Sequence, residues 1–485
     1  MTDVRTRFAP SPTGAMHLGN LRVAVFNWLF ARRYKGSFLV RMEDTDVDRN
    51  VEGSEERILD DLSWCGLHWD EGPDTTGPRG PYRQSQRSEA YQAAAQALEE
   101  AGKAYRCYCT DAELAQERVT LEDGSAVQRY SGRCRRRSAE ERERLEASGA
   151  SWALRLAVPG GDVEVEDRAR GRIVFPEGDL DDFILLRRDG RPTYNFAVVV
   201  DDVGMAITHV IRGAGHLSNT HKQAVLFDAF DVERPVFAHL PTVLGPDRKK
   251  LSKRDHGTAV AELRQEGLHP DGVMNYVSLL GWSPGGDREV LDRQELVELI
   301  DLERVGVSDT VYDPEKLRWF SAQHIARMPV DRLSEAVAPW LPETLPIPRD
   351  HLSWGLEALR SRLHSFREVR DHLAELEAPT GERWRKAMAL LVEDPGASSV
   401  LGAVRDRLAS VEPWEPQAVN EAVRAGGKDQ GAKGRALFVP VRLALTGREK
   451  GPELPTLAAA LGRVEVLRRL ERALEALAAP DAEVD

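Results

Sequence analysis

The sequence PSPTGAMHLGN, residues 10–20, decides the fold around it. Just before it, apolar and polar residues alternate from Val4 to Phe8, which is the period of a short strand. After it, Leu21, Val25 and Leu29 recur at helical spacing, and residues 38–43 form a second apolar run. A strand, a Pro/Gly loop, a helix and a strand in close succession make a βαβ unit. We therefore predict a parallel sheet that begins at the N-terminus.

The loop in this unit is a candidate phosphate site. Ligands of such units bind beyond the carboxyl ends of the strands, where backbone N–H groups at the helix N-terminus attract phosphate. His17 could donate a hydrogen bond to a phosphate oxygen, and Gly19 would let a flat base approach the backbone. The alternative is a surface loop that merely turns the chain. The position between strand and helix favours a site.

A second motif, RKKLSKR at residues 248–254, supports this interpretation. Taken alone, such a cationic run is more often a solvated surface than a site. Together with the upstream His-x-Gly loop it resembles the second signature of class I aminoacyl-tRNA synthetases. Four further stretches narrow the resemblance: RFAPSPTG at 7–14, RMEDTD at 41–46, PTYN at 192–195 and VIRG at 210–213. Over essentially its whole length the sequence resembles bacterial glutamyl-tRNA synthetases.

The resemblance implies a glutamate pocket of cations and one anion. Its residues are Arg7, Ala9, Ser11, Glu43, Tyr194 and Arg212. The charges suit the substrate, because the two arginines would bind carboxylates and Glu43 would bind the ammonium. A buried arginine would also reject glutamine, which cannot accept a bidentate charge-assisted pair. For Arg7 alone, the alternative is a strand residue that faces solvent.

The resemblance also implies how ATP binds. The residues concerned are His17, Gly19, Asn20, Gly215, Val243, Leu244 and Lys253. Activation of an amino acid needs alignment and charge stabilisation rather than a protein nucleophile, and His17, Lys250 and Lys253 suit that task. Mg²⁺ is expected on the phosphates, held largely by substrate and water. The chain departs from the family at Ala214-Gly215, where relatives usually carry an acidic pair that contacts ATP, and at Asn20, a common change.

Three cysteines suggest a metal site. Cys107, Cys109 and Cys134 supply three sulfur ligands, whereas structural zinc normally takes four. Spacing alone leaves zinc and buried free thiols equally open. The family resemblance favours one structural Zn²⁺ bound by these cysteines and Tyr130, since some bacterial members bind zinc through such a set. Arg136 stands where other members place a histidine, and it cannot bind metal.

Composition sets the remaining expectations. With 485 residues, 41 % of them hydrophobic, the chain should divide into three or four domains. No apolar run approaches the roughly 20 residues that cross a bilayer, and no signal peptide is recognisable, so we expect no membrane partner. Four cysteines suggest a reducing cytoplasm. The net charge of −13 says little about RNA, because a polyanion responds to local potential.

The expected fold is a Rossmann-like parallel sheet split by an α+β insertion and followed by an all-α anticodon-binding region. The expected domains are 1–88 with 189–218 (catalytic), 89–188 (an insertion for the tRNA acceptor end, with the zinc site), 219–326 (a stem-contact domain carrying a mobile lysine loop) and 327–485 (helical). The apolar run of residues 196–200 predicts a strand buried on both faces. Residues 57–64, 352–376 and the C-terminal segment predict helices.

The sequence therefore predicts a monomeric ligase that joins glutamate to its tRNA, and that is expected to need bound tRNA for activation. The tRNA for glutamine is a second candidate partner. Arg360, Arg362 and Arg442 are candidate anticodon contacts, with ordinary surface arginines as an equally open alternative. A tRNA-modifying relative lacks the C-terminal third, and glutaminyl-tRNA synthetases end in β-barrels. A non-catalytic tRNA-binding paralogue is the alternative from another class; it would be expected to have lost His17 or Lys253.

Overall fold

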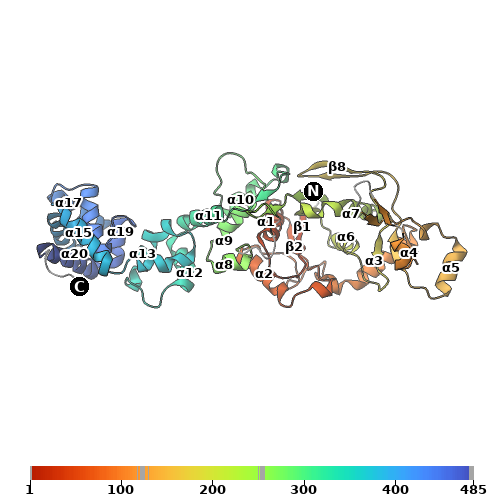
Figure 1. Cartoon of the computed structure of the whole chain (residues 1–485), viewed down its shortest axis with the longest axis horizontal. Helices are drawn as coiled ribbons and strands as arrows, with labels where there is room; N and C mark the ends of the chain where they lie inside the picture. The colour runs from red at the N-terminus through yellow and green to blue at the C-terminus, as the bar shows by residue number, and fades with distance from the viewer. Residues whose placement is uncertain are drawn as a thin grey trace. The chain divides into compact units, whose positions relative to one another are not determined.

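The computed structural model describes residues 3–116, 118–120, 126–128, 130–249, 251 and 257–479. The chain divides into two compact units. Unit 1 comprises Met1–Leu263 and Met274–Pro314, and unit 2 comprises Arg264–Val273 and Glu315–Asp485. Figure 1 shows sheets and helices in unit 1 and helices in unit 2.

A six-stranded sheet organises unit 1, with the strand order β2-β1-β10-β11-β7-β8. The strands are β1 (Arg5–Phe8), β2 (Ser37–Val40), β7 (Val163–Asp167), β8 (Gly171–Phe175), β10 (His209–Gly213) and β11 (Val236–Leu240). The first five strands in this order run parallel, and β8 pairs antiparallel with β7. The predicted parallel sheet and its first βαβ unit are confirmed.

Helix α1 (Leu18–Arg33) joins β1 to β2 and owes its position to the residues around it. Its apolar face, including Leu21 and Leu29, is fully buried. Gly36 follows the helix at a point where a Cβ would lie 2.0 Å from the carbonyl oxygen of Val4. Only glycine fits where the chain turns so tightly into β2. The turn then sets β1 and β2 side by side in register.

The strand predicted for residues 196–200 is wrong. These residues lie in helix α6 (Tyr194–Gly204), which packs against helices α3 and α7. Every residue from Phe196 to Asp202 is buried. A helix covered on all sides is apolar all round and loses the 3.6-residue period. A short apolar run of this kind cannot be distinguished from a buried strand by periodicity alone.

A smaller antiparallel sheet lies in the segment expected to form the insertion, with the order β3-β6-β9. Its strands are β3 (Ala104–Cys107), β6 (Ala153–Leu156) and β9 (Ile184–Leu186), and a separate pair is β4 (Arg118–Thr120) with β5 (Ala126–Gln128). Strands β7 and β8 come from the same segment but belong to the six-stranded sheet. The domain limits given above stay predictions.

The other elements that begin before residue 314 are mostly short helices. The α-helices are α2 (Ser54–Trp64), α3 (Ser88–Glu100), α4 (Asp111–Ala115), α5 (Ala139–Ala147), α7 (Leu217–Ala229), α8 (Val260–Gln265), α9 (Pro270–Leu279) and α10 (Arg293–Leu299). The 3-10 segments include η3 (Cys134–Arg136) and η4 (Ala214–His216). Strands β12 (Val243–Leu244) and β13 (Thr310–Val311) pair in parallel. Helix α2 confirms the helix predicted at 57–64.

The rest of the chain is helical: among its described residues, 315–479, no β-strand occurs. The helices are α11 (Pro314–Arg327), α12 (Val330–Val337), α13 (Leu352–Leu359), α14 (Val369–Ala374), α15 (Gly381–Glu393), α16 (Ala397–Ala409), α17 (Pro416–Asp429), α18 (Arg435–Thr446), α19 (Leu454–Leu461) and α20 (Arg463–Ala478). The all-α prediction is confirmed.

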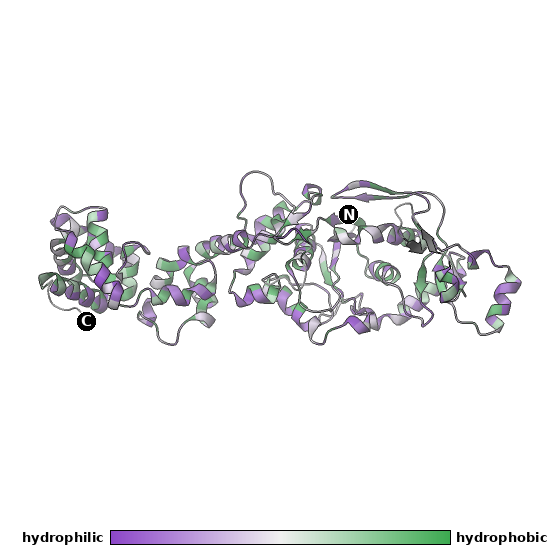
Figure 2. Cartoon of the chain, viewed as in Figure 1, coloured by the Kyte–Doolittle hydropathy of each residue, from purple (hydrophilic) through white to green (hydrophobic). Residues whose placement is uncertain are grey.

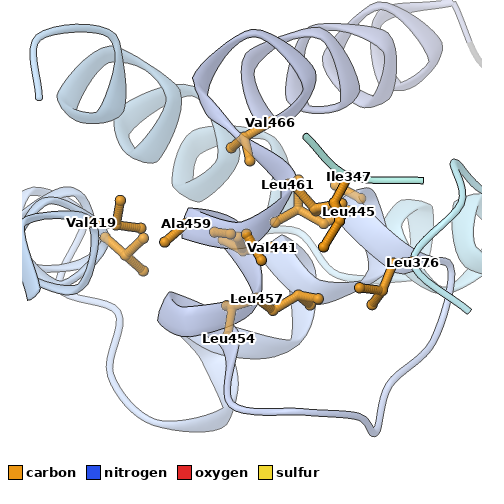
Figure 3. Close-up of a cluster of buried hydrophobic side chains, with 14 of the residues drawn as sticks. Ile347, Leu376, Val419, Val441, Leu445, Leu454, Leu457, Ala459, Leu461 and Val466 are labelled. Atoms are coloured by element: carbon orange, nitrogen blue, oxygen red, sulfur yellow. The ribbon is translucent and has the colours of Figure 1, made fainter. Parts of the chain in front are cut away.

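The helices of unit 2 share one apolar core. Figure 3 shows side chains of α17, α18, α19 and α20 pointing toward one another, among them Val419, Val441, Leu457 and Val466. Figure 2 shows hydrophobic and hydrophilic residues alternating around the helices, as expected when each has one buried face. In the described chain, no single helix has the length and apolarity to cross a membrane. Only α15 and α16 taken together, bent by 107°, meet those limits.

Candidate active site

A cavity of about 510 Å³ lies at the carboxyl ends of β1 and β10 and at the N-terminus of α1. This is where ligands bind in parallel α/β sheets. Its lining includes Arg7, Phe8, Ala9, Pro10, Ser11, Thr13, Gly14, Ala15, Met16, His17, Asn20, Val23, Glu43, Arg49, Ile58, Tyr194, Arg212, Gly213, His216 and Asn219. Residues far apart in the sequence therefore meet in one pocket.

All six residues predicted for the glutamate site line this cavity. Of the residues predicted for ATP, His17 and Asn20 also line it. Gly215 lies in η4 between residues that approach the pocket, while Val243 and Leu244 form β12, and none of these three is among the lining residues. Gly19 has a local reason to be glycine, because a Cβ there would lie 2.9 Å from Cε1 of His17.

His17 caps helix α1 with its own side chain. Its Nδ1 atom accepts hydrogen bonds from the backbone N–H groups of Gly19, at 3.0 Å, and Asn20, at 3.3 Å. A neutral imidazole carries one N–H, so accepting at Nδ1 assigns the proton to Nε2. Nε2 is then the ring atom that can donate to a phosphate oxygen. The cap thus fixes both the position and the tautomer of the ring.

A cluster of buried charges supports one side of the cavity. Arg7 donates to both carboxylate oxygens of Asp202, at 3.1 and 3.4 Å, and Arg41 donates to the same Asp202 at 2.6 Å. Arg41 also bonds Glu43 at 3.4 Å and lies 3.7 Å from Asp201. Burial would raise the pKa of Asp202, but the two arginines outweigh it and lower that pKa. Asp202 therefore stays ionised and holds both guanidinium groups.

The two other carboxyls of the cluster behave differently. Burial raises the pKa of Glu43 despite Arg41 and Arg7, and it raises the pKa of Asp201 despite Arg41 and Arg87. Glu43 lines the cavity, so a cationic ligand group there would offset the burial that disfavours its charge. Asp201 accepts from Arg87 at 2.5 Å and from Gln84 at 2.7 Å, and it is not among the residues that line the cavity.

Arg212, on the neighbouring strand β10, has a different environment. Its three donor nitrogens bond uncharged acceptors: His239 at 3.1 Å, Gln223 at 2.7 Å and Thr220 at 3.0 Å. Within the described part of the chain it forms no ion pair with a carboxylate. Burial lowers its pKa to about 10, so the group is still a cation at neutral pH. A buried cation with only neutral partners favours an anionic ligand.

Tyr194 and His216 stand at the edge of the cavity. Tyr194 is 37 % exposed, and its hydroxyl lies 3.1 Å from Nδ1 of His216. Both residues line the pocket. The phenol therefore offers a polar group to a ligand that reaches Arg212, and His216 fixes where that group lies.

Residues next to the lysine motif contact the loop that carries His17. Lys250 and Lys253 lie outside the described residues. After the motif, Leu18 N–H donates to Thr258 at 3.0 Å and Val260 N–H donates to Met16 at 2.9 Å. Within it, Leu251 N–H donates to the Val243 carbonyl at 3.2 Å. Backbone hydrogen bonds thus tie the residues that follow the motif to the His17 loop.

The cysteine cluster forms a compact site in unit 1. The three sulfurs of Cys107, Cys109 and Cys134 lie within 4.8 Å of one another and all are buried. The Tyr130 hydroxyl lies 3.5 Å from Cys107 Sγ and 4.0 Å from Cys109 Sγ. Tetrahedral zinc with Zn–S bonds of about 2.3 Å needs sulfurs about 3.8 Å apart, which this set approaches. Three thiols and one phenol therefore fit the ligand number of a structural zinc site.

The arginines proposed as anticodon contacts are engaged within unit 2. Arg360 lies 2.8 Å from Glu357, and Arg362 bonds Glu375 at 2.9 and 3.3 Å. Arg442 is half-buried and donates to the carbonyl of Pro452. These contacts neither exclude RNA nor require it, so the three residues remain predictions.

The sequence reasoning missed the residues that support the pocket from behind. Asp201 and Asp202 follow an apolar run, and two acids in a buried segment are a signal that could have been used. His239 stands alone between Phe237 and Leu240 and offers no comparable signal. His216 and Asn219 follow directly on the altered Ala214-Gly215 pair, and only the structure shows that they line the pocket.

The fold and the pocket define a class I aminoacyl-tRNA synthetase, and comparisons with known families agree. Residues 3–319 match the catalytic domain of class I tRNA synthetases of the E and Q group, and residues 332–474 match an anticodon binding domain. The match to the catalytic domain covers most of the chain.

Curated relatives narrow the class. The glutamate–tRNA ligase of Desulforudis audaxviator is 44 % identical over 98 % of this chain and 97 % of its own length, and that of Geobacillus stearothermophilus is 40 % identical over 98 % and 99 %. A crystal structure of the glutamate–tRNA ligase of Elizabethkingia meningosepticum in complex with its amino acid has a TM-score of 0.80 and 31 % identity, covering 98 % of this chain and all of the other. The chain belongs to the bacterial glutamate–tRNA ligase family.

Proposed function

We propose that this chain activates L-glutamate with ATP and transfers the glutamyl group to the 3′ end of its tRNA. The observation that carries the proposal is the cavity in which Arg7, Arg212 and Glu43 meet beside His17. Two cations and one anion are the complement of an amino acid with two carboxylates and one ammonium. The named activity of the relatives agrees with this pocket and favours the ligase over a non-catalytic paralogue.

Glutamate recognition rests on the charges just described. Three of the five N–H groups of Arg212 are donated within the described structure, which leaves one on each terminal nitrogen for a carboxylate. Glu43 would bind the ammonium, whose charge favours the ionised carboxyl. Arg7 would bind the second carboxylate, and Ala9, Ser11 and Tyr194 would shape the pocket. Glutamine has no side-chain carboxylate, so it would leave one of the two arginines without an anionic partner in a buried site, which costs far more than the loss of an exposed contact.

Activation displaces pyrophosphate when a glutamate carboxylate oxygen attacks the α-phosphate of ATP. His17 would donate to the phosphate chain through Nε2, a role that the hydrogen bonds accepted by its Nδ1 support. Lys250 and Lys253 would bring cations that stabilise the charge on the reacting phosphate and the leaving group. Gly19, Asn20, Gly215, Val243 and Leu244 are the proposed contacts to the nucleotide. Mg²⁺, bound to the phosphates, would offset their charge.

The tRNA is proposed to contact two parts of the chain. Residues 332–474, which match an anticodon binding domain, would read the anticodon, with Arg360, Arg362 and Arg442 as candidate contacts. The segment 89–188 would receive the acceptor end. We propose tRNA-dependent activation, a monomeric and cytoplasmic enzyme, and the tRNA for glutamine as a second candidate substrate. Four buried free cysteines suit a reducing compartment.

A structural Zn²⁺ is proposed for Cys107, Cys109, Cys134 and Tyr130. The close approach of the three sulfurs and the hydroxyl supports it. The metal would hold together the segments that follow β3 and contain η3. Metal analysis of the purified chain is expected to give one zinc per molecule, and a Cys134→Ser variant is expected to lose it. Absence of zinc from the purified chain would leave the cluster as buried thiols.

The test of the proposed function is ATP–pyrophosphate exchange with glutamate or glutamine, each with and without total tRNA. Exchange is expected with glutamate and tRNA together. Exchange driven by glutamine would contradict the role of Arg7 and Arg212. Exchange without tRNA would keep the enzyme class and remove the tRNA dependence. No exchange under any condition would contradict the ligase and direct attention to Ala214 and Gly215.

A further inference from the structure

A histidine outside the recognised motifs, His239, accepts a hydrogen bond from Arg212. His239 lies on β11, directly opposite Arg212 on the neighbouring parallel strand β10. Its Nε2 atom is 3.1 Å from Nε of Arg212, and its side chain is completely buried. Thr220 on α7 lies 3.0 Å from Nη2 of Arg212 and 3.1 Å from Nε2 of His239. These contacts fix the guanidinium group through its Nε and Nη2 atoms.

The tautomer of His239 is set from a third strand. Nδ1 of His239 lies 2.5 Å from Oδ2 of Asp167, the last residue of β7. Asp167 also accepts the backbone N–H groups of Ala169 and Arg170, each at 3.0 Å, so its carboxylate is held in place. The hydrogen bonds lower the pKa of Asp167 although burial would raise it. An ionised Asp167 takes the single N–H of a neutral imidazole, which leaves Nε2 to accept from Arg212.

We propose that His239, in the tautomer that Asp167 selects, is a positioning residue for the glutamate site and that protonation of His239 weakens glutamate binding. The proposal rests on the role of Arg212 given under Proposed function. A protonated ring would carry N–H on Nε2, so it would point a donor at the Nε–H donor of Arg212 and place a second positive charge beside it. Arg212 would then lose the partner that orients its free edge toward the cavity.

The groups around His239 set the direction of its titration. It is faced by Asp167 from β7, Arg212 from β10 and Arg170 from the turn after β7, whose Nε donates to the His239 carbonyl at 3.3 Å. Thr220 and Gln223 of α7, which share Arg212 with it, carry no charge. Burial, Arg212 and Arg170 lower the pKa of His239, and Asp167 only partly opposes them. The ring is therefore neutral at pH 7, and the acceptor is lost as the pH falls below the usual histidine range.

Two substitutions distinguish the role of Nε2 of His239 from that of Nδ1. In His239→Gln the amide oxygen can occupy the place of Nε2 and accept from Arg212 without titrating. In His239→Asn the shorter amide reaches the place of Nδ1, so it keeps Asp167 and leaves Arg212 without its acceptor. His221→Gln is the matched control, because His221 is also buried but is not among the hydrogen-bond partners of Arg212.

The experiment measures KM for glutamate and for ATP in tRNA-dependent pyrophosphate exchange with the full chain. His239→Asn is expected to raise KM for glutamate roughly tenfold to a hundredfold, since misplacement of a binding group by about an ångström has effects of that size, with KM for ATP nearly unchanged. His239→Gln is expected to stay much closer to the parent. Equal effects of both substitutions, or parallel rises in both KM values, would overturn the proposal.

The pH dependence provides a second measurement that does not need His239→Asn to fold. As the pH falls below about 6.5, the ordinary pKa of histidine, KM for glutamate is expected to rise in the parent and to rise less in His239→Gln, because the pKa of His239 lies below that value. The same pH profile in both proteins would overturn the protonation effect. A parent chain without glutamate-dependent exchange would instead contradict the proposed function, so the two failures are distinguishable.

Discussion

Two arginine arrangements at the cavity differ. On the paired side of this comparison, Arg7 and Arg41 share the carboxylate of Asp202. On its unpaired side, Arg212 has only neutral hydrogen-bond partners. The first arrangement compensates its charge within the protein and stabilises the fold around the pocket. The second leaves a positive charge for the ligand. Stability should therefore depend mainly on the paired side, and substrate affinity and selectivity mainly on the unpaired side.

The largest expected effect is on the side with neutral partners. Arg212→Ala should lower kcat/KM for glutamate by about 10⁴-fold, because the variant lacks the cation that a buried carboxylate requires. Steady-state exchange kinetics measure this loss. Arg172→Ala, which alters an exposed arginine on β8, is the control and should be close to the parent. A loss of less than tenfold in Arg212→Ala would show that Arg7 alone provides the charge.

Substitutions on the paired side should lower the free energy of unfolding. Asp202→Ala leaves two buried guanidinium groups without their shared carboxylate, which should lower the free energy of unfolding by about 3–5 kcal/mol. Urea denaturation measures it, with Asp228→Ala, a change in an exposed ion pair, as control. The contribution of Asp202 is present above the unfolded aspartate pKa of about 3.9 and disappears as the pH falls through its lowered folded pKa. Equal stability of the two variants would remove the distinction between the sides.

His17 allows structure and catalysis to be separated on the phosphate side of the pocket. Asparagine is a good N-cap residue but lacks a counterpart of Nε2, so His17→Asn should keep the stability of the parent within about 1 kcal/mol. Its kcat should fall by about 10²–10³-fold, the usual effect of removing one donor to a charge that develops in the transition state. Thermal unfolding and single-turnover rates provide the two measurements. An active variant would limit His17 to its capping role.

The smallest expected effect is at Tyr194. Tyr194→Phe removes a neutral hydroxyl at a partly exposed position. The binding free energy of glutamate should weaken by roughly 1 kcal/mol, so its KM should rise about fivefold. His216→Ala tests whether the hydroxyl acts through its contact at 3.1 Å, because the double variant should then be less impaired than the sum of the two changes predicts. Full additivity would indicate that the two side chains act independently.

Much of the fold and part of the pocket could be predicted from the sequence. The first βαβ unit and the helical C-terminal region follow from local patterns, and the six residues that the family resemblance assigns to glutamate all line the cavity. The helix α6 could not be predicted, because burial on every side removes its period. His239 and Asp167 could not be predicted either. Their role depends on β7, β10 and β11 being neighbours, which no local pattern reports.

The order of the strands also bears on how the chain is made. Strand β1 is synthesised among the first residues, yet one of its two neighbours is β10, and Arg5 bonds Thr208 across a separation of 203 residues. At about 5–20 residues per second, a ribosome needs roughly 10–40 seconds to cover that interval. During that time β1 and β2 have an open edge and the pocket has no Arg212. Synthesis of this enzyme therefore includes an interval in which its most recognisable motif exists without its site.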